Sequence, residues 1–340
     1  MNFPPLGFRI GTLFIFIILA LGTACFGDSS QNIVFVTSVG GDSEVYSLDP
    51  ATGESVALTD NQSRDFDPRW SPDGKQVVFL SDESGDVEIN LVDRAGEVVV
   101  RLTHNAGDDT SPRWSPDGQR IAFISHRDNQ PEIYLMAADG SNPTRVTNNS
   151  TDDRLGDWSP DGVWLVFYSV GDETERGLWL RNPDGVDQFH VTNGDDRDPV
   201  WSPDDRHIAF VRNEGGNKDI YIVSRMKNGV WQDIIEPTRL TQHETADLSP
   251  AWSPDGKTLA FVSYRDGNAE IYTMRPDGSR QTRLTSNEVD DLSPTWSKDG
   301  KRIAFVSHLY GTGEIFAMNI DGTSQQRLTS NTVEDSFPDW

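Results

Sequence analysis

Apolar and polar residues follow one another in short blocks along residues 31–340, and the same order of blocks recurs about every 44 residues. Each unit contains two short runs of β-forming residues, separated by a polar loop and followed by an Asp-Gly turn. Short apolar runs bounded by turn residues are typical of strands that are covered on both faces. Because no stretch beyond residue 30 shows helical periodicity over two or more turns, we predict an all-β chain.

A tryptophan marks the same place in every unit. It is followed by Ser-Pro-Asp-Gly or a close variant in six units, and it is the last residue of the chain in the seventh. Proline presets one turn dihedral and glycine accepts a positive φ, so this motif predicts a tight turn. The tryptophans are Trp70, Trp114, Trp158, Trp201, Trp252, Trp296 and Trp340. Their spacing is in the range of a four-stranded propeller blade.

Each unit divides into four predicted strands. The first strand ends at the tryptophan, and the fourth carries Arg-Leu-Thr or a variant of it. The predicted second strands are Val77–Leu80, Ile121–Ile124, Leu165–Tyr168, Ile208–Val211, Leu259–Val262 and Ile303–Val306. The clearest third strands are Glu132–Met136, Asp219–Val223, Glu270–Met274 and Glu314–Met318.

The two ends of the repeated region complement each other. Residues 33–36, 44–48 and 56–59 match the second, third and fourth strands of a unit that lacks a first strand. Asp335–Trp340 is a first strand with nothing after it. We therefore predict a seven-bladed β-propeller of four-stranded blades, closed by pairing of the C-terminal strand with the N-terminal blade, which removes the sheet edges.

The repeated series P-x-W-S-P-D-G, I-A-F-x-S, E-I-Y-x-M, D-G and R-L-T resembles the WD40-like (PD40) propeller repeat of the TolB family. The resemblance covers residues 31–340 and implies the propeller fold. TolB proper carries an α/β domain before its propeller, and this chain has only a leader there. The same propeller occurs in relatives of the prolyl oligopeptidases and in oligogalacturonate lyases, so the fold does not dictate the function.

The N-terminal segment, residues 1–24, has the features of a signal peptide. Arg9 is its only charge, and residues 10–24 form an apolar run that is short for a membrane span. Gly22-Thr23-Ala24-Cys25 resembles a bacterial lipobox, which implies lipidation of Cys25, with residues 25–30 as a short linker. The alternatives are an ordinary signal peptide or an uncleaved anchor. We expect export to the periplasmic or cell-surface side of a bacterial membrane.

Charge and cysteine content narrow the function classes. The chain has 29 Lys and Arg against 54 Asp and Glu, a net charge of −25. Such a chain is repelled by phosphate backbones and anionic lipid, so we expect no nucleic-acid partner and membrane contact only through a lipid anchor. Because Cys25 is the only cysteine, an intramolecular disulfide and a cysteine-based zinc site are excluded. We expect a monomer.

Aspartates are the most regular candidate site residues. One stands five residues before each tryptophan, and four units have a second Asp just before it. Blade geometry places these residues in loops around one mouth of the central channel. They are Asp65, Asp108, Asp109, Asp152, Asp153, Asp195, Asp196, Asp247, Asp290, Asp291 and Asp335. One interpretation is an acidic funnel that binds Ca²⁺ or a basic partner; the other is that these aspartates fix turns through backbone hydrogen bonds.

The sequence contains no nucleophile elbow and no zinc-protease motif. His126 and His308 follow the second strands of two units at equivalent positions, and the lyase relatives use His-rich metal sites. We predict a non-catalytic propeller that binds an envelope protein or peptide, without a cofactor other than possible Ca²⁺. A carbohydrate-active lyase or hydrolase and a purely structural interaction module are the alternatives. Trp231, in the one long insertion, is either an exposed contact or a side chain folded back on its hairpin.

Overall fold

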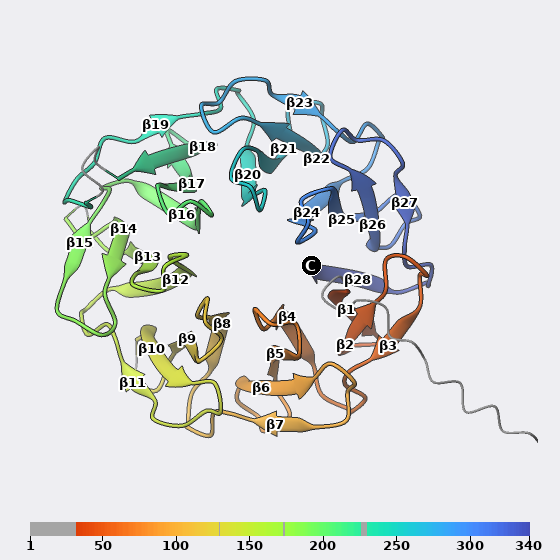
Figure 1. The fold of residues 1–340 in the computed structure, drawn as a ribbon, viewed down its shortest axis with the longest axis horizontal. Helices are drawn as coiled ribbons and strands as arrows, with labels where there is room; N and C mark the ends of the chain where they lie inside the picture. Colours follow the sequence, from red (N-terminus) through yellow and green to blue (C-terminus); the bar gives the residue numbers. More distant parts are fainter. Residues whose placement is uncertain (1–31, 129, 173, 226–229) are drawn as a thin grey trace, which may run out of the picture.

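Seven antiparallel sheets of four strands stand in a ring around a central channel (Figure 1). The computed structural model describes residues 32–340 except residues 129, 173 and 226–229. Within these residues it contains 28 strands and no helix that is long and apolar enough to cross a membrane. The predicted all-β, seven-bladed propeller is confirmed. The leader, Cys25 and the linker lie outside the described residues.

The strands of each blade run from the channel to the rim in chain order, with one exception. Blade 1 takes its innermost strand from the C-terminus and consists of β28 (Glu334–Asp339), β1 (Ile33–Val39), β2 (Asp42–Leu48) and β3 (Ser55–Ala57). Blade 2 is β4 (Asp65–Trp70), β5 (Gln76–Ser81), β6 (Glu88–Asp93) and β7 (Val99–Arg101). Blade 3 is β8 (Asp109–Trp114), β9 (Arg120–Ser125), β10 (Glu132–Ala137) and β11 (Thr144–Arg145).

The remaining blades follow the same order. Blade 4 is β12 (Asp152–Trp158), β13 (Leu165–Val170), β14 (Gly177–Arg181) and β15 (Gln188–His190). Blade 5 is β16 (Asp195–Trp201), β17 (His207–Glu214), β18 (Asn217–Ser224) and β19 (Thr238–Arg239). Blade 6 is β20 (Asp247–Trp252), β21 (Leu259–Ser263), β22 (Glu270–Met274) and β23 (Thr282–Arg283). Blade 7 is β24 (Asp291–Trp296), β25 (Arg302–Ser307), β26 (Glu314–Asn319) and β27 (Gln326–Arg327).

The ring closes in blade 1, where β28 pairs antiparallel with β1 (Figure 1). Val36 lies opposite Ser336, and Thr37 lies opposite Asp335. The Thr37 hydroxyl also donates a hydrogen bond of 2.8 Å to the Asp335 carboxylate. The predicted closure by the C-terminal strand is therefore confirmed.

The tryptophan that ends each innermost strand packs between two blades. All seven are buried, with exposures of 3–9%. Trp114, for example, lies in one apolar cluster with Leu80 of blade 2 and Phe123 of blade 3. Four indole N–H groups also donate to backbone carbonyl groups in the preceding blade: Trp70 to Asn32, Trp158 to Arg113, Trp252 to Val200 and Trp296 to Ala251. Burial of one tryptophan per blade, together with these four indole hydrogen bonds, thus joins neighbouring sheets.

Every innermost strand is irregular in the middle. Its pairing with the second strand of its blade shifts register at a bulge in all seven blades. In six blades a residue other than glycine has a positive φ there, as in Asp67 at 48° and Ser111 at 54°. A bulge bends the strand and changes the direction of the side chains that follow it. The residue just before each tryptophan therefore lies at the channel.

Residues 230–235 of the long insertion in blade 5 cover the outer edge of blade 4. The backbone N–H of Ile235 donates to the carbonyl of Val191, next to β15, at 2.7 Å. Trp231 is buried at 5% exposure and packs edge-on against Trp201, with ring centroids 5.3 Å apart. The Arg225 guanidinium lies 5.6 Å from the Trp231 ring. Trp231 is therefore part of the core and is not an exposed contact.

Trp340→Ala should destabilise the fold strongly, because it removes the apolar wedge of the closing strand. We expect a loss of about 3–5 kcal/mol in the free energy of unfolding, as for other buried aromatic truncations. Phe337→Ala is the matched control, since Phe337 lies in β28, the strand that Trp340 follows, but is half exposed. Denaturant unfolding of both variants tests this expectation. Equal stabilities for the two variants would show that closure does not depend on the tryptophan.

Candidate functional site

The seven aspartates that stand five residues before the tryptophans lie inside their blades. Each is the first or second residue of an innermost strand, and each is buried, with exposures of 0–2%. They are Asp65, Asp109, Asp153, Asp196, Asp247, Asp291 and Asp335. Their carboxylates accept hydrogen bonds from side chains of the same blade or the loop before it. They do not form an exposed surface at the channel mouth.

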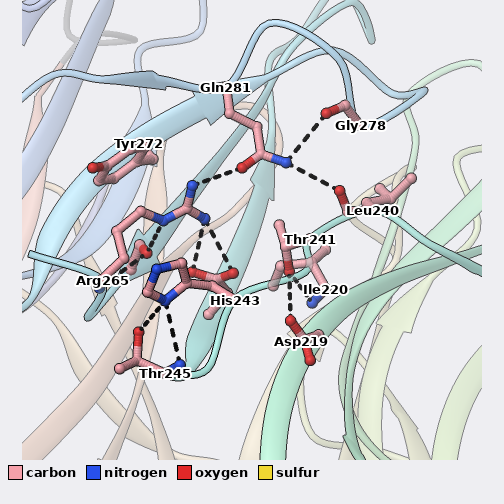
Figure 2. Close-up of polar contacts among 12 residues, drawn as sticks. Asp219, Ile220, Leu240, Thr241, His243, Thr245, Arg265, Tyr272, Gly278 and Gln281 are labelled. Atoms are coloured by element: carbon pink, nitrogen blue, oxygen red, sulfur yellow. Dashed lines mark hydrogen bonds and ion pairs between the residues drawn. The ribbon is translucent and has the colours of Figure 1, made fainter.

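Three of these aspartates pair with an arginine of the same blade. Asp109 lies 3.1 Å from Arg127 in blade 3, and Asp196 lies 2.6 Å from Arg212 in blade 5. In blade 6 the Arg265 guanidinium lies 3.2 Å from the buried carboxylate of that blade, donates to Gln281 and lies over Tyr272 (Figure 2). The arginine neutralises the buried carboxylate and covers an aromatic ring.

The other four aspartates have no arginine among these partners. An asparagine four residues upstream donates to each of them at 2.7–2.8 Å: Asn61 to Asp65, Asn149 to Asp153, Asn287 to Asp291 and Asn331 to Asp335. Burial raises the pKa of all four carboxyls, because it disfavours the charged form. The pKa of Asp153 rises to about 6.

The second acids are more exposed, and their carboxylates also have partners. Asp108 accepts a hydrogen bond from the backbone N–H of Val87, and Asp290 accepts one from Ala269, both in the preceding blade. Asp195 accepts from Asn213 and pairs with Arg197 at 3.2 Å, and Asp152 lies 3.8 Å from Arg154. Asp108 and Asp290 therefore join neighbouring blades. Within the described chain no three Asp, Glu, His or Cys residues form a group suited to a metal ion.

A hollow lies at the other end of the innermost strands. It has a volume of about 670 Å³ and is lined by residues just before and after the blade tryptophans. We call it the channel hollow. The bulges bring one side chain from each blade to it, from the position directly before the tryptophan. These residues are Asp339, Arg69, Arg113, Asp157, Val200, Ala251 and Thr295 in blades 1 to 7.

Blades 1 to 4 make one half of the channel hollow charged. Arg69 lies 2.8 Å from Asp67 and 3.9 Å from Asp339. Arg113 donates to the carbonyl of Gly156 at 3.2 Å and lies 3.9 Å from Asp67. These charges form an arc of alternating sign across four neighbouring blades.

Asp157 ends this charged arc. Its carboxylate accepts a hydrogen bond of 2.8 Å from the backbone N–H of Trp158. Burial raises the pKa of Asp157, although the Arg113 guanidinium acts in the opposite direction. Three carboxylates and two guanidinium groups leave one negative charge in excess in the arc.

In blades 5 to 7 the residues directly before the tryptophans are uncharged, while Asp198 and Lys298 place one charge of each sign elsewhere in the lining. Val200, Ala251 and Thr295 hold the positions equivalent to the arginines, and Pro199 and Pro250 lie beside them. Sequence reasoning missed this site, because the position before the tryptophan varies from blade to blade. The signal for this site in the sequence is the residue directly before the tryptophan, which is charged in blades 1 to 4 and uncharged in blades 5 to 7.

The two histidines singled out from the sequence have structural partners. The backbone N–H groups of His126 and His308 donate to the carbonyls of Asp108 and Asp290. The His308 ring also lies 3.3 Å from Glu334. Each histidine thus contacts the loop that enters its own or the next blade.

Asp153→Asn should flatten the pH dependence of stability. The folded-state pKa of Asp153 is about 6, above its ordinary value of 3.8, so the folded state binds the proton more tightly. This contribution is fully present below about pH 4 and is lost as pH rises through 6. Between pH 7 and 5 we expect Asp153 to add about 1 kcal/mol to the free energy of unfolding. Urea unfolding across this range measures it.

Asp187→Asn, which removes an exposed carboxylate from the same blade, controls for the loss of one charge. The slope of stability against pH should be smaller in Asp153→Asn than in Asp187→Asn. Identical slopes would contradict a role for the buried carboxyl.

Relatives share this propeller but differ in what their names describe. The TolB of Syntrophus aciditrophicus, named a Tol-Pal system protein, is 40% identical over 75 residues, which is 22% of this chain and 16% of that protein. The crystal structure of TolB from Acinetobacter baumannii matches with a TM-score of 0.60 and 22% identity, covering 92% of this chain and 67% of that one. An oligogalacturonate lyase in complex with manganese matches with a TM-score of 0.67 and 17% identity, covering 85% and 86%.

The structural matches are below 25% identity and support the fold alone. This chain spans about a sixth of the length of the Syntrophus protein. The family model described as the TolB beta propeller domain matches residues 21–227 and 177–340, which together include all seven blades. The chain therefore belongs to the TolB β-propeller family.

Proposed function

We propose that this protein is a non-catalytic, exported propeller that binds a protein or peptide of the bacterial cell envelope in its channel hollow. The main support is that the residues directly before the tryptophans, which line this hollow, are charged in blades 1 to 4 and uncharged in blades 5 to 7. The name of the Syntrophus relative, which places it in the Tol-Pal system, supports a partner in the envelope. The leader of this chain supports export.

An extended peptide has the chemistry that the channel hollow offers. Its backbone presents carbonyl acceptors for Arg69 and Arg113 and N–H donors for Asp157 and Asp339. Its apolar side chains can pack on the wall formed by Val200 and its neighbours in blades 6 and 7. A basic residue of the peptide would offset the excess negative charge of the arc.

The lyase alternative rests on the similarity of fold to the oligogalacturonate lyase. Lyase chemistry requires a base at the sugar and an electrophile that stabilises the carbanion. In the described chain the candidate His126 and His308 bond to loop backbones, and the channel arc pairs Asp67 and Asp339 with Arg69. We therefore propose binding as the function.

A photo-crosslinking residue in place of Thr295, one of the three uncharged residues before the tryptophans, should form an adduct with an envelope protein in the native envelope fraction. Combining this crosslinker with Arg69→Met or with Asp157→Asn should lower the yield of the adduct at least fivefold, because each substitution removes part of the charged arc. The same crosslinker at Gln326, exposed on β27, is the matched control and should give no such adduct. Thermal melting verifies that the variants remain folded.

A third crosslinker position distinguishes the two ends of the channel. Asn193 is exposed in the loop before β16, beside the aspartates. Adducts from Asn193 but not from Thr295 would place the partner at the acid-rich mouth and contradict the proposal. A yield that Arg69→Met leaves unchanged would also contradict it.

We further propose that Cys25 is lipidated and holds the propeller at a membrane surface. Cys25→Ala should move the protein from the membrane fraction to the supernatant, because the acyl chains on this residue supply the membrane affinity. Washing with high salt controls for electrostatic adsorption. Identical fractionation of the variant and the native protein would show that Cys25 is not the anchor.

A further inference from the structure

Blade 2 departs from the other six blades at one position in its third strand. Six blades have an aromatic residue there, and blade 2 has Asn90. The aromatic residues are Tyr46, Tyr134, Trp179, Tyr221, Tyr272 and Phe316. Each lies opposite the phenylalanine of the second strand, as Asn90 lies opposite Phe79.

A hollow of about 220 Å³ is found at this place in blade 2. We call it the blade 2 hollow, and it is lined by Ser81, Glu83, Ser84, Glu88, Asn90 and Arg101. One water molecule takes about 30 Å³ of the liquid, so the hollow has room for the head group of a side chain. The space is present because Asn90 has no aromatic ring, unlike the equivalent residues of the other six blades.

Blade 2 also carries a reversed charge in the adjoining loop. Blades 3 and 6 have Arg127 and Arg265 two residues after the serine that ends their second strand, and blade 2 has Glu83 there. One backbone contact of the loop is the same in all three blades. The backbone nitrogen of this residue lies 3.4–3.5 Å from the serine hydroxyl oxygen in each blade.

The arginines of blades 3 and 6 show which group fits such a place. Arg127 donates to the Ser125 hydroxyl at 2.7 Å, pairs with buried Asp109 and lies 4.5 Å from the centre of the Tyr134 ring. Arg265 makes the corresponding contacts in blade 6, where Figure 2 shows it beside Tyr272. A guanidinium is thus the natural neighbour of the serine and the buried aspartate.

Blade 2 keeps the acids of this arrangement and lacks the cation. Glu88 is 1% exposed; Arg101 bonds to one of its carboxylate oxygens at 2.6 Å, and the other accepts no hydrogen bond within the described residues. In blade 3 the equivalent oxygen of Glu132 accepts from the Thr147 hydroxyl.

The local charge is therefore more negative in blade 2 than in blade 3. Asp65, Glu83 and Glu88 face one cation, Arg101. Burial raises the pKa of Asp65, and the Glu83 carboxylate raises it further. In blade 3 two arginines, Arg127 and Arg145, face three acids, Asp109, Asp128 and Glu132, so the excess is one negative charge there and two in blade 2. An incoming cation would remove this difference.

We propose that the blade 2 hollow binds the guanidinium of an arginine side chain presented by a partner protein. The guanidinium takes the place that Arg127 and Arg265 occupy in their blades, between the Ser81 hydroxyl and the carboxylates of Glu83 and Glu88. Its fixed set of N–H donors suits two carboxylates and a hydroxyl at once. The site is separate from the channel hollow and does not depend on the function proposed for it.

N-acetyl-L-argininamide is the probe, because it carries the side chain as a protein would. In an NMR titration it should shift the resonances of the Asn90 side-chain amide and the Ser84 backbone amide in a saturable way. Glu83→Arg with Asn90→Tyr rebuilds the arrangement of blades 3 and 6. This double variant should bind the probe at least tenfold more weakly and melt no lower than the native protein.

The reverse exchange in blade 3 is the matched gain-of-function control. Arg127→Glu with Tyr134→Asn should create a second site for the probe, with shifts in the neighbouring β10 resonances. No saturable shift in the native protein would overturn the proposal. Equal affinity of the native protein and the Glu83→Arg/Asn90→Tyr variant would overturn it as well.

Titrations with other cations test whether the blade 2 hollow is specific for the guanidinium of a protein side chain. N-acetyl-lysinamide should bind at least fivefold more weakly than the arginine probe, and sodium at matched ionic strength should give no saturable shift. Saturation by CaCl₂ that displaces the arginine probe would make the hollow a metal site. Free L-arginine binding at least tenfold more tightly than the probe would make the ligand an amino acid and not a protein side chain. Either result would overturn the proposal.

Discussion

The structure depends on one contact that is repeated around the ring, the packing of a tryptophan between neighbouring blades. A four-stranded sheet of this size has two apolar faces and cannot bury either of them alone, so each blade needs its neighbours. The tryptophan at the end of each innermost strand supplies that contact at the narrow end of the wedge. Because a ring has no terminal unit, closure by β28 and β1 completes the same contact for blade 1. Sites for other molecules must then be formed by side chains that take no part in this repeated packing.

Most of the fold could be predicted from the sequence, since each blade repeats the same apolar runs, turns and tryptophan. The predicted strand Ile121–Ile124 is β9 shortened by one residue at each end, and Glu132–Met136 is β10 shortened by one. Closure followed from Asp335–Trp340, a first strand without a second. The place of Trp231 could not be predicted, because its partner Trp201 and the covered edge of blade 4 are set by tertiary contacts.

The candidate sites were harder to predict than the fold. The regular aspartates stood out in the sequence, but their regularity reflects a structural position: each is buried at the start of an innermost strand and accepts hydrogen bonds there. Sequence alone cannot tell a buried carboxylate with an asparagine donor from one that faces the channel. The charged arc of the channel hollow escaped notice because the bulge, which turns Arg69 and its neighbours toward the channel, is a backbone feature. The blade 2 hollow needs two facts together, the loss of a ring at Asn90 and the reversed charge at Glu83.

We infer that function lies where the blades differ and not where they agree. Hydrogen exchange of the protein, with and without its envelope partner fraction, tests this most directly. A partner in the channel hollow should slow exchange at the tryptophan ends of β28, β4, β8 and β12, which carry the charged arc, with little change at the aspartate ends of the same strands. Slower exchange spread evenly over the aspartate ends of all seven innermost strands would contradict this inference, because the partner would then bind the feature that all blades share.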